Sequence, residues 1–134
     1  MGSVALILLD TNVLLWTVSD SKRLSRDATR EIDKARRRDG LAISAITLWE
    51  IALLVSRGRV QAYGTVEASV KLISEGVIVR PITQEIAALA TQFPDDYPGD
   101  PVDRLIGATA RAEGLTLLTS DERIRNSPLL KTVW

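Results

Sequence analysis

Four acidic residues of this sequence stand where a carboxylate is costly: Asp10, Glu50, Asp103 and Asp121 each lie at the edge of an apolar run. An ionised carboxylate taken out of water needs a cationic partner or a shared metal ion, or else its pKa changes. The chain has no histidine and no cysteine, which excludes Ser-His-Asp and Cys-His catalysis. Ligand sets made only of oxygen suit Mg²⁺ and Mn²⁺. The pattern therefore indicates a metal-dependent hydrolase acting on phosphodiesters.

Asp10 and Asp121 each follow a short apolar segment that is predicted to be a strand. The plainest explanation of either residue alone is a helix N-cap, because aspartate readily accepts hydrogen bonds from the first backbone amides of a helix. In open parallel sheets, however, functional groups lie just beyond the carboxyl ends of the strands. Both roles stay open for these two residues.

Glu50 and Asp103 lie on apolar faces of predicted helices. Arg57, two turns along the same face, could form an ion pair with Glu50, which is a common way to keep a buried acid. Asp100 is the natural N-cap of a helix that has Pro101 at its first position. Asp103 heads the face that should pack on the sheet, so it is the predicted ligand and Asp100 is held in reserve.

Other polar residues near these acids could assist them. Arg104 is a candidate for a contact with a substrate phosphate, because its guanidinium matches that group. Small polar residues could orient the ligands through hydrogen bonds, or could simply be turn and cap residues. These residues are Thr11, Asn12, Ser44 and Thr119. The densest basic cluster, Lys34 with residues 36–38, is better explained as a solvated helix end than as an RNA contact.

Strands and helices alternate along the whole sequence. Strands are predicted over residues 4–9, 41–44, 77–82, 115–119 and 131–134, and helices over 13–17, 25–38, 46–57, 65–75, 83–92, 101–113 and 121–125. This alternation predicts an α/β fold with a mainly parallel central sheet of about five strands, flanked by helices. The helix 46–57 is apolar nearly all round, so it should be buried or lie in a subunit interface.

Composition limits the remaining possibilities. The 134 residues, 46% of them hydrophobic, are enough for a single domain covering 1–134 with a real core. The 17 basic and 17 acidic residues cancel, so RNA binding would need a local basic patch. The first apolar stretch is too short to span a membrane and no basic leader precedes it. We expect a protein without membrane contact, in a reducing cytoplasm that suits a chain without cysteine.

The segments that contain the four acids resemble the acidic motifs of PIN domains. They read LLDTNV around Asp10, SAITLWEI around Glu50, DPVDRLIGATA around Asp103 and LLTSD up to Asp121. More narrowly, the chain is similar to the VapC-type ribonuclease toxins of prokaryotic toxin–antitoxin pairs. The motifs occur in the family's order, and the resemblance covers nearly the whole chain, including the closing strand that ends at Trp134.

The resemblance implies a PIN-like fold, RNA cleavage that depends on Mg²⁺ or Mn²⁺, homodimerisation and inhibition by a cognate antitoxin. It also implies that Asp10, Glu50, Asp103 and Asp121 form the acidic quartet, which would hold a metal-activated water for attack on phosphorus. One departure is that relatives with the Asp-Pro-x-Asp-Arg motif often have a histidine shortly before it. Here residues 98 and 99 are proline and glycine, which bears on substrate selection more than on metal binding.

Three other classes fit less well. A haloacid-dehalogenase-like phosphatase needs a second aspartate two residues after the first, and that position is Asn12. A receiver domain needs an acidic pair at the first strand and a lysine after the fifth, and neither is found. The non-enzymatic alternative is a catalytically silent, dimeric PIN-like module that docks a basic partner peptide on its acids. A divalent-metal titration separates it from the nuclease, which alone should gain stability.

Overall fold

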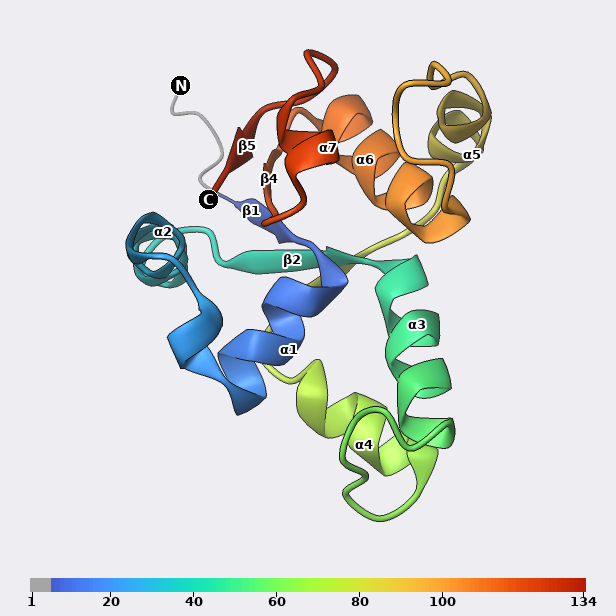
Figure 1. Ribbon diagram of the computed structural model, residues 1–134. Helices are drawn as coiled ribbons and strands as arrows, with labels where there is room; N and C mark the ends of the chain where they lie inside the picture. Colours follow the sequence, from blue (N-terminus) through green and yellow to red (C-terminus); the bar gives the residue numbers. More distant parts are fainter. Residues whose placement is uncertain (1–5) are drawn as a thin grey trace.

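Five short strands form the centre of the structure, a computed structural model that describes residues 6–134 (Figure 1). They are β1 (Ile7–Leu9), β2 (Leu41–Ser44), β3 (Ile78–Arg80), β4 (Thr116–Leu118) and β5 (Thr132–Val133). Their order in the sheet is β3-β2-β1-β4-β5, and every neighbouring pair is parallel. The predicted α/β fold is confirmed, with a sheet that is parallel throughout. The beginning of the predicted strand 4–9 lies outside the described residues.

The inner strands are buried on both faces, as their continuous apolar sequences predict. In β1, Leu8 packs in one core, whereas Ile7 and Leu9 pack in the other, because successive side chains of a strand point to opposite faces. The edge strand β3 differs, since Ile78 and Val79 are 43% and 40% exposed. One edge of the sheet is therefore less covered than its centre.

Seven α-helices are found within residues 6–134, and none is long and apolar enough to cross a membrane. They are α1 (Thr11–Ser19), α2 (Arg26–Arg36), α3 (Ala45–Ser56), α4 (Val66–Ile73), α5 (Gln84–Thr91), α6 (Pro101–Glu113) and α7 (Glu122–Arg125), with a 3₁₀ turn, η1 (Ser21–Arg23), after α1. The predicted helices agree with these bounds to within two residues at either end. In α3, Ile51 and Val55 are buried but Trp49 is 55% exposed, so this apolar helix is covered on one side only.

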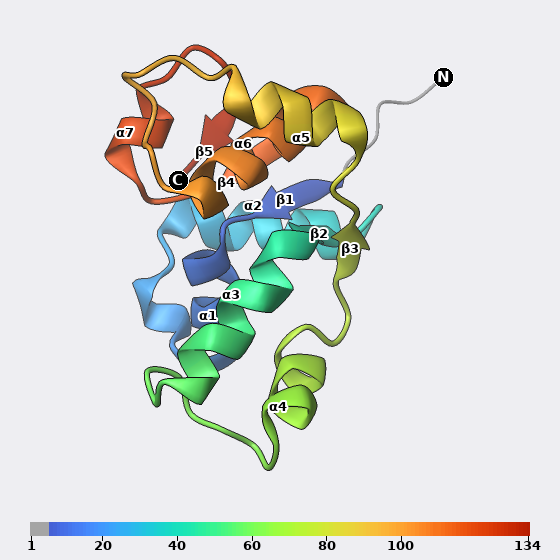
Figure 2. The same ribbon diagram turned by 90° about the vertical axis from the view of Figure 1, so that its right-hand side faces the viewer.

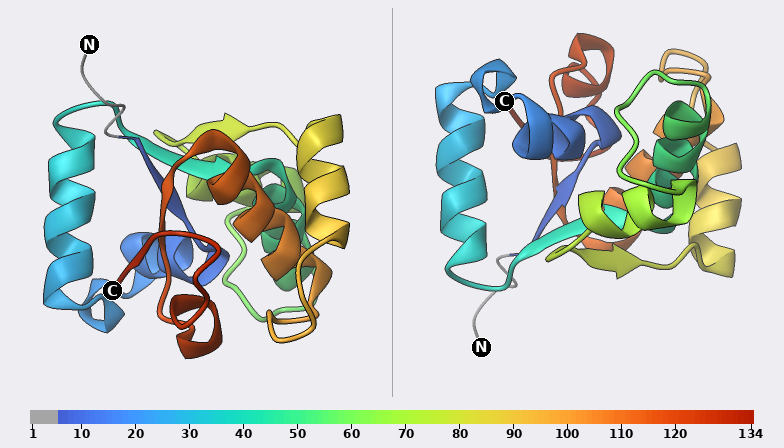
Figure 3. Two further views of the ribbon diagram at one scale, coloured as in Figure 1. Left: turned by 90° about the horizontal axis from the view of Figure 1, so that it is seen from above. Right: turned by 90° about the horizontal axis from the view of Figure 1, so that it is seen from below.

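The helices form a layer on each face of the sheet. In Figures 1 and 2, α5, α6 and α7 lie on one side of the strands, and α1, α3 and α4 lie on the other. Views from above and below show α2 and α5 at opposite flanks of the molecule (Figure 3). Two hydrophobic clusters correspond to these layers, one shared by α1 to α4 and one by α5 to α7.

The order of the strands creates a switch point at the centre of the sheet. From β1 the chain moves outward through β2 to β3, and it then returns to the other side of β1 for β4 and β5. In such sheets, ligands bind outside the carboxyl ends of the strands where this order reverses. Asp10 directly follows β1, and Thr119 directly follows β4, so both residues lie at that edge.

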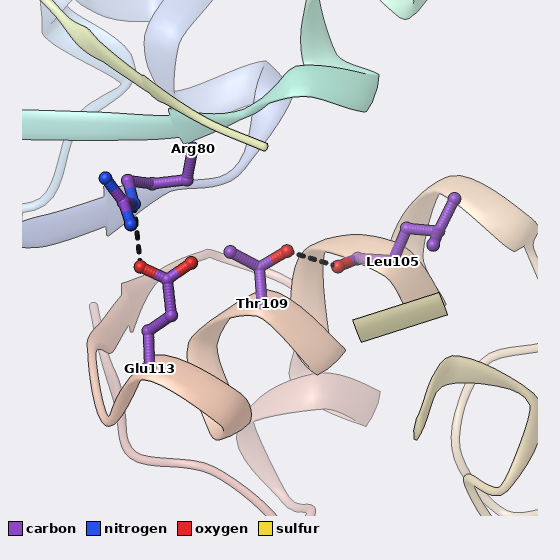
Figure 4. A network of polar contacts seen from close by, with 4 residues as sticks. All are labelled: Arg80, Leu105, Thr109 and Glu113. Atoms are coloured by element: carbon purple, nitrogen blue, oxygen red, sulfur yellow. Dashed lines mark hydrogen bonds and ion pairs between the residues drawn. The ribbon is translucent and has the colours of Figure 1, made fainter. Parts of the chain in front are cut away.

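An ion pair connects the edge strand to the helix that carries Asp103. Nε of Arg80, in β3, donates to Oε1 of Glu113, in α6, over 2.7 Å, and Figure 4 shows the pair beside Thr109 of the same helix. The Thr109 hydroxyl donates to the Leu105 carbonyl, 2.8 Å away, and is thereby satisfied inside the fold. The pair attaches α6 to the sheet at the end of the helix opposite to Asp103.

Candidate metal centre

Asp10 is both the cap of α1 and a buried carboxylate at the central edge of the sheet. Its Oδ1 accepts a hydrogen bond from the Thr11 amide, and its Oδ2 accepts one from the Thr119 hydroxyl, both at 2.8 Å. Burial raises the pKa of Asp10, and these two hydrogen bonds oppose that increase. An ionised carboxylate offers about four lone-pair sites, so capping leaves acceptor capacity for a cation.

Thr119 joins Asp10 to Asp121. Its hydroxyl donates to Asp10 and accepts from the backbone amide of Asp121, 3.1 Å away, and the side chain is completely buried. Asp121 caps α7, with Oδ1 accepting from the amides of Arg123 and Ile124 at 2.9 and 3.3 Å. The N-cap explanation is therefore correct for both aspartates, and the strand-end position is correct as well.

Glu50 lies on α3 and is connected to the residues at this edge by two threonine side chains. Its carboxylate is hydrogen-bonded to the Thr11 side chain, whose Oγ1 lies 3.0 Å from Oγ1 of the buried Thr47. Burial raises the pKa of Glu50, and the charges of Asp10 and Asp100 add to the increase. The alternative ion pair with Arg57 is wrong, since no ion pair among residues 6–134 includes Glu50.

Asp103 carries the clearest electrostatic evidence for a shared acidic site. It lies in the first turn of α6, and its pKa is raised to about 7 by burial and by the negative charges of Asp10, Asp100, Asp121 and Glu50. The charges of the other acids contribute to this shift, and such contributions fall off with distance. Four segments that are far apart in the sequence therefore bring their acids to one edge.

Asp100 is the N-cap of α6, as predicted, because its Oδ1 accepts a hydrogen bond from the Val102 amide over 2.8 Å. Ser44 is likewise a cap, completely buried at the end of β2, and accepts from the Ile46 amide at 3.3 Å. Asn12 is exposed on the first turn of α1. Of the predicted polar neighbours, Thr11 and Thr119 are the two that contact the acids directly.

The donor set fits a hard divalent cation. Every candidate ligand is a carboxylate, and no ion pair within residues 6–134 neutralises any of the four. No three acidic side chains in this part of the chain are already gathered as a complete ligand set, so binding requires them to move together. A divalent ion would oppose both the burial and the repulsion that raise the Asp103 pKa, and Mg²⁺ or Mn²⁺ is the cation such oxygen ligands prefer.

The hydrogen bonds of Arg104 contradict the prediction that this residue contacts a substrate phosphate. All five of its N–H groups are used within the chain: Nε donates to the carbonyl of Pro98, and the terminal nitrogens donate to the carbonyls of residues 90, 93, 94 and 97, at 2.9 to 3.5 Å. No donor remains for a phosphate, because a guanidinium has five. Arg104 instead holds the loop before α6 against the end of α5.

Two further contacts position α6, and sequence reasoning missed both. The buried Tyr97 donates its hydroxyl to the Asp103 carbonyl, 3.3 Å away, and burial beside the Asp103 charge raises the tyrosine pKa. Gly107 lies beneath this ring: a Cβ there would collide with the Tyr97 hydroxyl and approach Cε2 of Phe93 to 2.9 Å. The only sequence signal was a glycine inside a helix, which often marks a close approach.

The basic cluster at the end of α2 lies away from the acids. Lys34 and residues 36–38 are exposed, and β2 begins only a few residues later, at Leu41. They therefore lie near the amino ends of the parallel strands, whereas Asp10 lies at a carboxyl end. This placement agrees with the solvated helix end that the sequence favoured.

A parallel five-stranded sheet with acids at its switch point is the architecture of a family of nucleases, and the comparisons with known proteins agree. Residues 7–128 match the PIN domain, and the chain belongs to this family. It is 39% identical over 130 residues to Ribonuclease VapC22 of Mycobacterium tuberculosis, a match that covers 96% of this chain and 98% of the relative.

Solved structures of toxin–antitoxin complexes share the fold. The chain is similar to a chain of VapBC2 from Rickettsia felis bound to a DNA fragment from their promoter, with a TM-score of 0.73 and 17% identity over 96% of this chain and 97% of the other. A DNA-bound VapBC from Salmonella typhimurium gives a TM-score of 0.70 and 19% identity, over 95% and 96% of the two chains. At these identities the similarity supports the fold alone.

Proposed function

We propose that this protein is a VapC-type endoribonuclease, the toxin of a type II toxin–antitoxin module, and that it hydrolyses RNA with Mg²⁺ or Mn²⁺. The observation that carries the proposal is the set of four carboxylates near the switch point, where burial and then the charges of the neighbouring acids raise the pKa of Asp103 to about 7. The 39% identical ribonuclease supports RNA as the substrate class. Catalysis by this site needs no histidine, in agreement with the composition.

In this mechanism Asp10, Glu50, Asp103 and Asp121 hold the cation. When bound, the cation lowers the pKa of water and stabilises the charge that develops on the phosphodiester. Thr119 fixes Oδ2 of Asp10 by its hydrogen bond, and Thr11 fixes the Glu50 carboxylate. These bonds restrain two of the four carboxylates, so that fewer groups have to reorganise when the cation binds.

A cognate antitoxin and a second copy of the chain are the proposed protein partners. Large apolar side chains remain exposed on the α1–α4 side, among them Val18, Trp49, Tyr63 and Leu72. A mainly apolar cleft of about 260 Å³ adjoins them, lined by residues that include Leu15, Val18, Val60, Tyr63 and Ile73. Exposed apolar patches of this kind mark protein interfaces. Because its proposed substrate is RNA and its proposed partner is an antitoxin, we expect this protein to act in the cytoplasm.

Sequencing of RNA ends after controlled expression tests the proposal. Wild-type protein should produce fragments with new 5′ phosphates at recurrent sites, and Asp10→Asn should produce none while remaining folded. Asp33→Asn, on the exposed outer face of α2, is the matched control and should cut like the wild type. If Asp10→Asn cuts as well as the wild type, the assignment of the acids is wrong. If neither protein cuts RNA with Mn²⁺ present, the silent docking module is the better account.

A further inference from the structure

A mostly polar cleft lies beside the acidic edge and is not used by the mechanism above. It has a volume of about 650 Å³, within the range of small-molecule sites. Its walls come from α7 and β5, and they consist of Glu122, Arg125, Asn126, Thr132, Val133 and Trp134. Its polar lining distinguishes it from the apolar cleft on the α1–α4 side.

The register of the sheet connects this cleft to the metal centre. β5 pairs with β4, and the Thr119 amide donates to the Val133 carbonyl over 3.3 Å. Trp134 therefore follows β5 at the level where Thr119 follows β4, and Thr119 is the residue that contacts Asp10. On the other wall, α7 begins directly after Asp121. If the phosphodiester that is cut lies at the acids, the next nucleotide of the RNA strand would lie in this cleft.

The side chains of the cleft have the chemistry that recognises a nucleotide. Trp134 provides an aromatic ring. The ring of Trp16 packs against it, with ring centroids 5.7 Å apart at an interplanar angle of 58°. The Arg23 guanidinium lies 4.5 Å from the centroid of the Trp16 ring, which adds a cation to this aromatic pair. Arg125 can contact a phosphate, and the Asn126 amide can donate to and accept from the edge of a base.

We propose that the cleft between α7 and β5 is a subsite for one unpaired nucleotide of the RNA substrate, next to the phosphodiester that is cut. The base stacks on Trp134, Asn126 and Glu122 contact its edge, and Arg125 contacts its phosphate. Glu122 accepts hydrogen bonds and therefore favours a base with an exocyclic amino group, as adenine, cytosine and guanine have. This proposal rests on the proposed ribonuclease function and adds a determinant of where the enzyme cuts.

A protein segment is the less suitable occupant. The large exposed apolar residues that would anchor such a segment are found on α1, α3, α4, the edge strand β3 and nearby loops, and none of them lines this cleft. Single-stranded nucleic acid, by contrast, is bound by aromatic rings and cations together. The lining of the cleft provides both.

Steady-state cleavage of a short single-stranded RNA tests the subsite. Arg125→Gln changes an exposed side chain, and Trp134→Leu removes the aromatic ring, with Trp134→Phe as its conservative counterpart. Loss of the stacking or phosphate contact should raise KM about tenfold and leave kcat nearly unchanged. Trp134→Phe should restore most of the affinity. Arg38→Gln, near the opposite ends of the strands, is the charge-matched control and should behave like the wild type.

Binding measured without cleavage separates this proposal from the one it rests on. In an Asp10→Asn background, anisotropy of the same labelled RNA should show weaker binding for Arg125→Gln, and the slope of log affinity against log salt should fall by about 0.7. Equal affinity and slope for Arg125→Gln and Arg38→Gln would overturn the subsite, even if the wild type cuts RNA. Weaker binding of an antitoxin with unchanged RNA affinity would assign the cleft to the protein partner and also overturn it. A wild type that binds RNA here but never cuts it would refute the nuclease and retain the subsite.

Discussion

Replacement of Asp103 by asparagine should make the metal-free protein more stable at neutral and alkaline pH, although it should abolish catalysis. In the wild type the folded-state pKa of Asp103 is about 7, against 3.8 for an ordinary aspartate. The folded state therefore holds a proton more tightly than the unfolded chain does. Stability from this proton is fully present below about pH 4 and is lost as the pH rises through about 7.

The size of the effect follows from the same pKa difference. If it applied in full, a pKa raised from 3.8 to about 7 would correspond to about 4 kcal/mol. The carboxyl group is only partly buried, and solvent screening reduces the expected loss to about 1 to 2 kcal/mol between pH 4 and pH 8. An asparagine side chain at this position carries no charge at any pH in this range. Asp103→Asn should thus match the wild type below about pH 4 and exceed it by about 1 to 2 kcal/mol at pH 8.

Urea unfolding in EDTA at several pH values measures this directly. The wild type should lose stability from pH 5 to pH 8, and Asp103→Asn should lose less. Asp33→Asn, which changes an exposed aspartate of α2, should keep the wild-type slope. Saturating Mn²⁺ should remove the difference or reverse it, because the cation stabilises only the protein that binds it. Equal slopes for the wild type and Asp103→Asn in EDTA would refute the electrostatic interpretation of the site.

Further predictions concern the residues that position the acids. Thr119→Val removes the hydroxyl that is hydrogen-bonded to both the Asp10 carboxylate and the Asp121 amide. Because loss of a contact that orients a metal ligand typically costs this much, kcat should fall about 10- to 100-fold. Thr119→Ser should retain most of the activity, and equal rates for the two variants would contradict this role. Arg104→Met leaves five carbonyls without their donor and should reduce the free energy of unfolding by about 2 to 3 kcal/mol in urea titrations. If Arg104→Met instead weakens RNA binding at unchanged stability, the phosphate contact was the correct assignment after all.

The elements of the fold could be predicted because their signals are local. Buried parallel strands give short apolar runs, and caps such as Asp10, Asp100 and Asp121 sit directly before the helices they begin. The acids could be grouped because one topological rule brings strand ends and helix starts to the same edge. Asp10 and Asp121 need not be either helix caps or functional residues, because a carboxylate has enough acceptor sites for both roles.

Contacts between distant segments could not be read from the sequence. Arg104 lies beside Asp103 in the chain, but its side chain turns toward the carbonyls of a loop whose path no local pattern predicts. Thr47 has no sequence signal beyond being a small polar residue in an apolar helix, yet it contacts Thr11 through its hydroxyl. Arg57 lies two turns from Glu50, which is longer than the usual spacing of a helical ion pair, and Glu50 is hydrogen-bonded to Thr11 instead.

Calorimetric titration of the purified protein with Mn²⁺ tests most directly whether these carboxylates share a divalent cation. The wild type should bind Mn²⁺ with release of protons at pH 7, because Asp103 is partly protonated there when its pKa is about 7. Asp10→Asn should bind far more weakly, and Asp33→Asn should bind like the wild type. Equal Mn²⁺ affinity in the wild type and Asp10→Asn, or no binding by the wild type at all, would contradict the account.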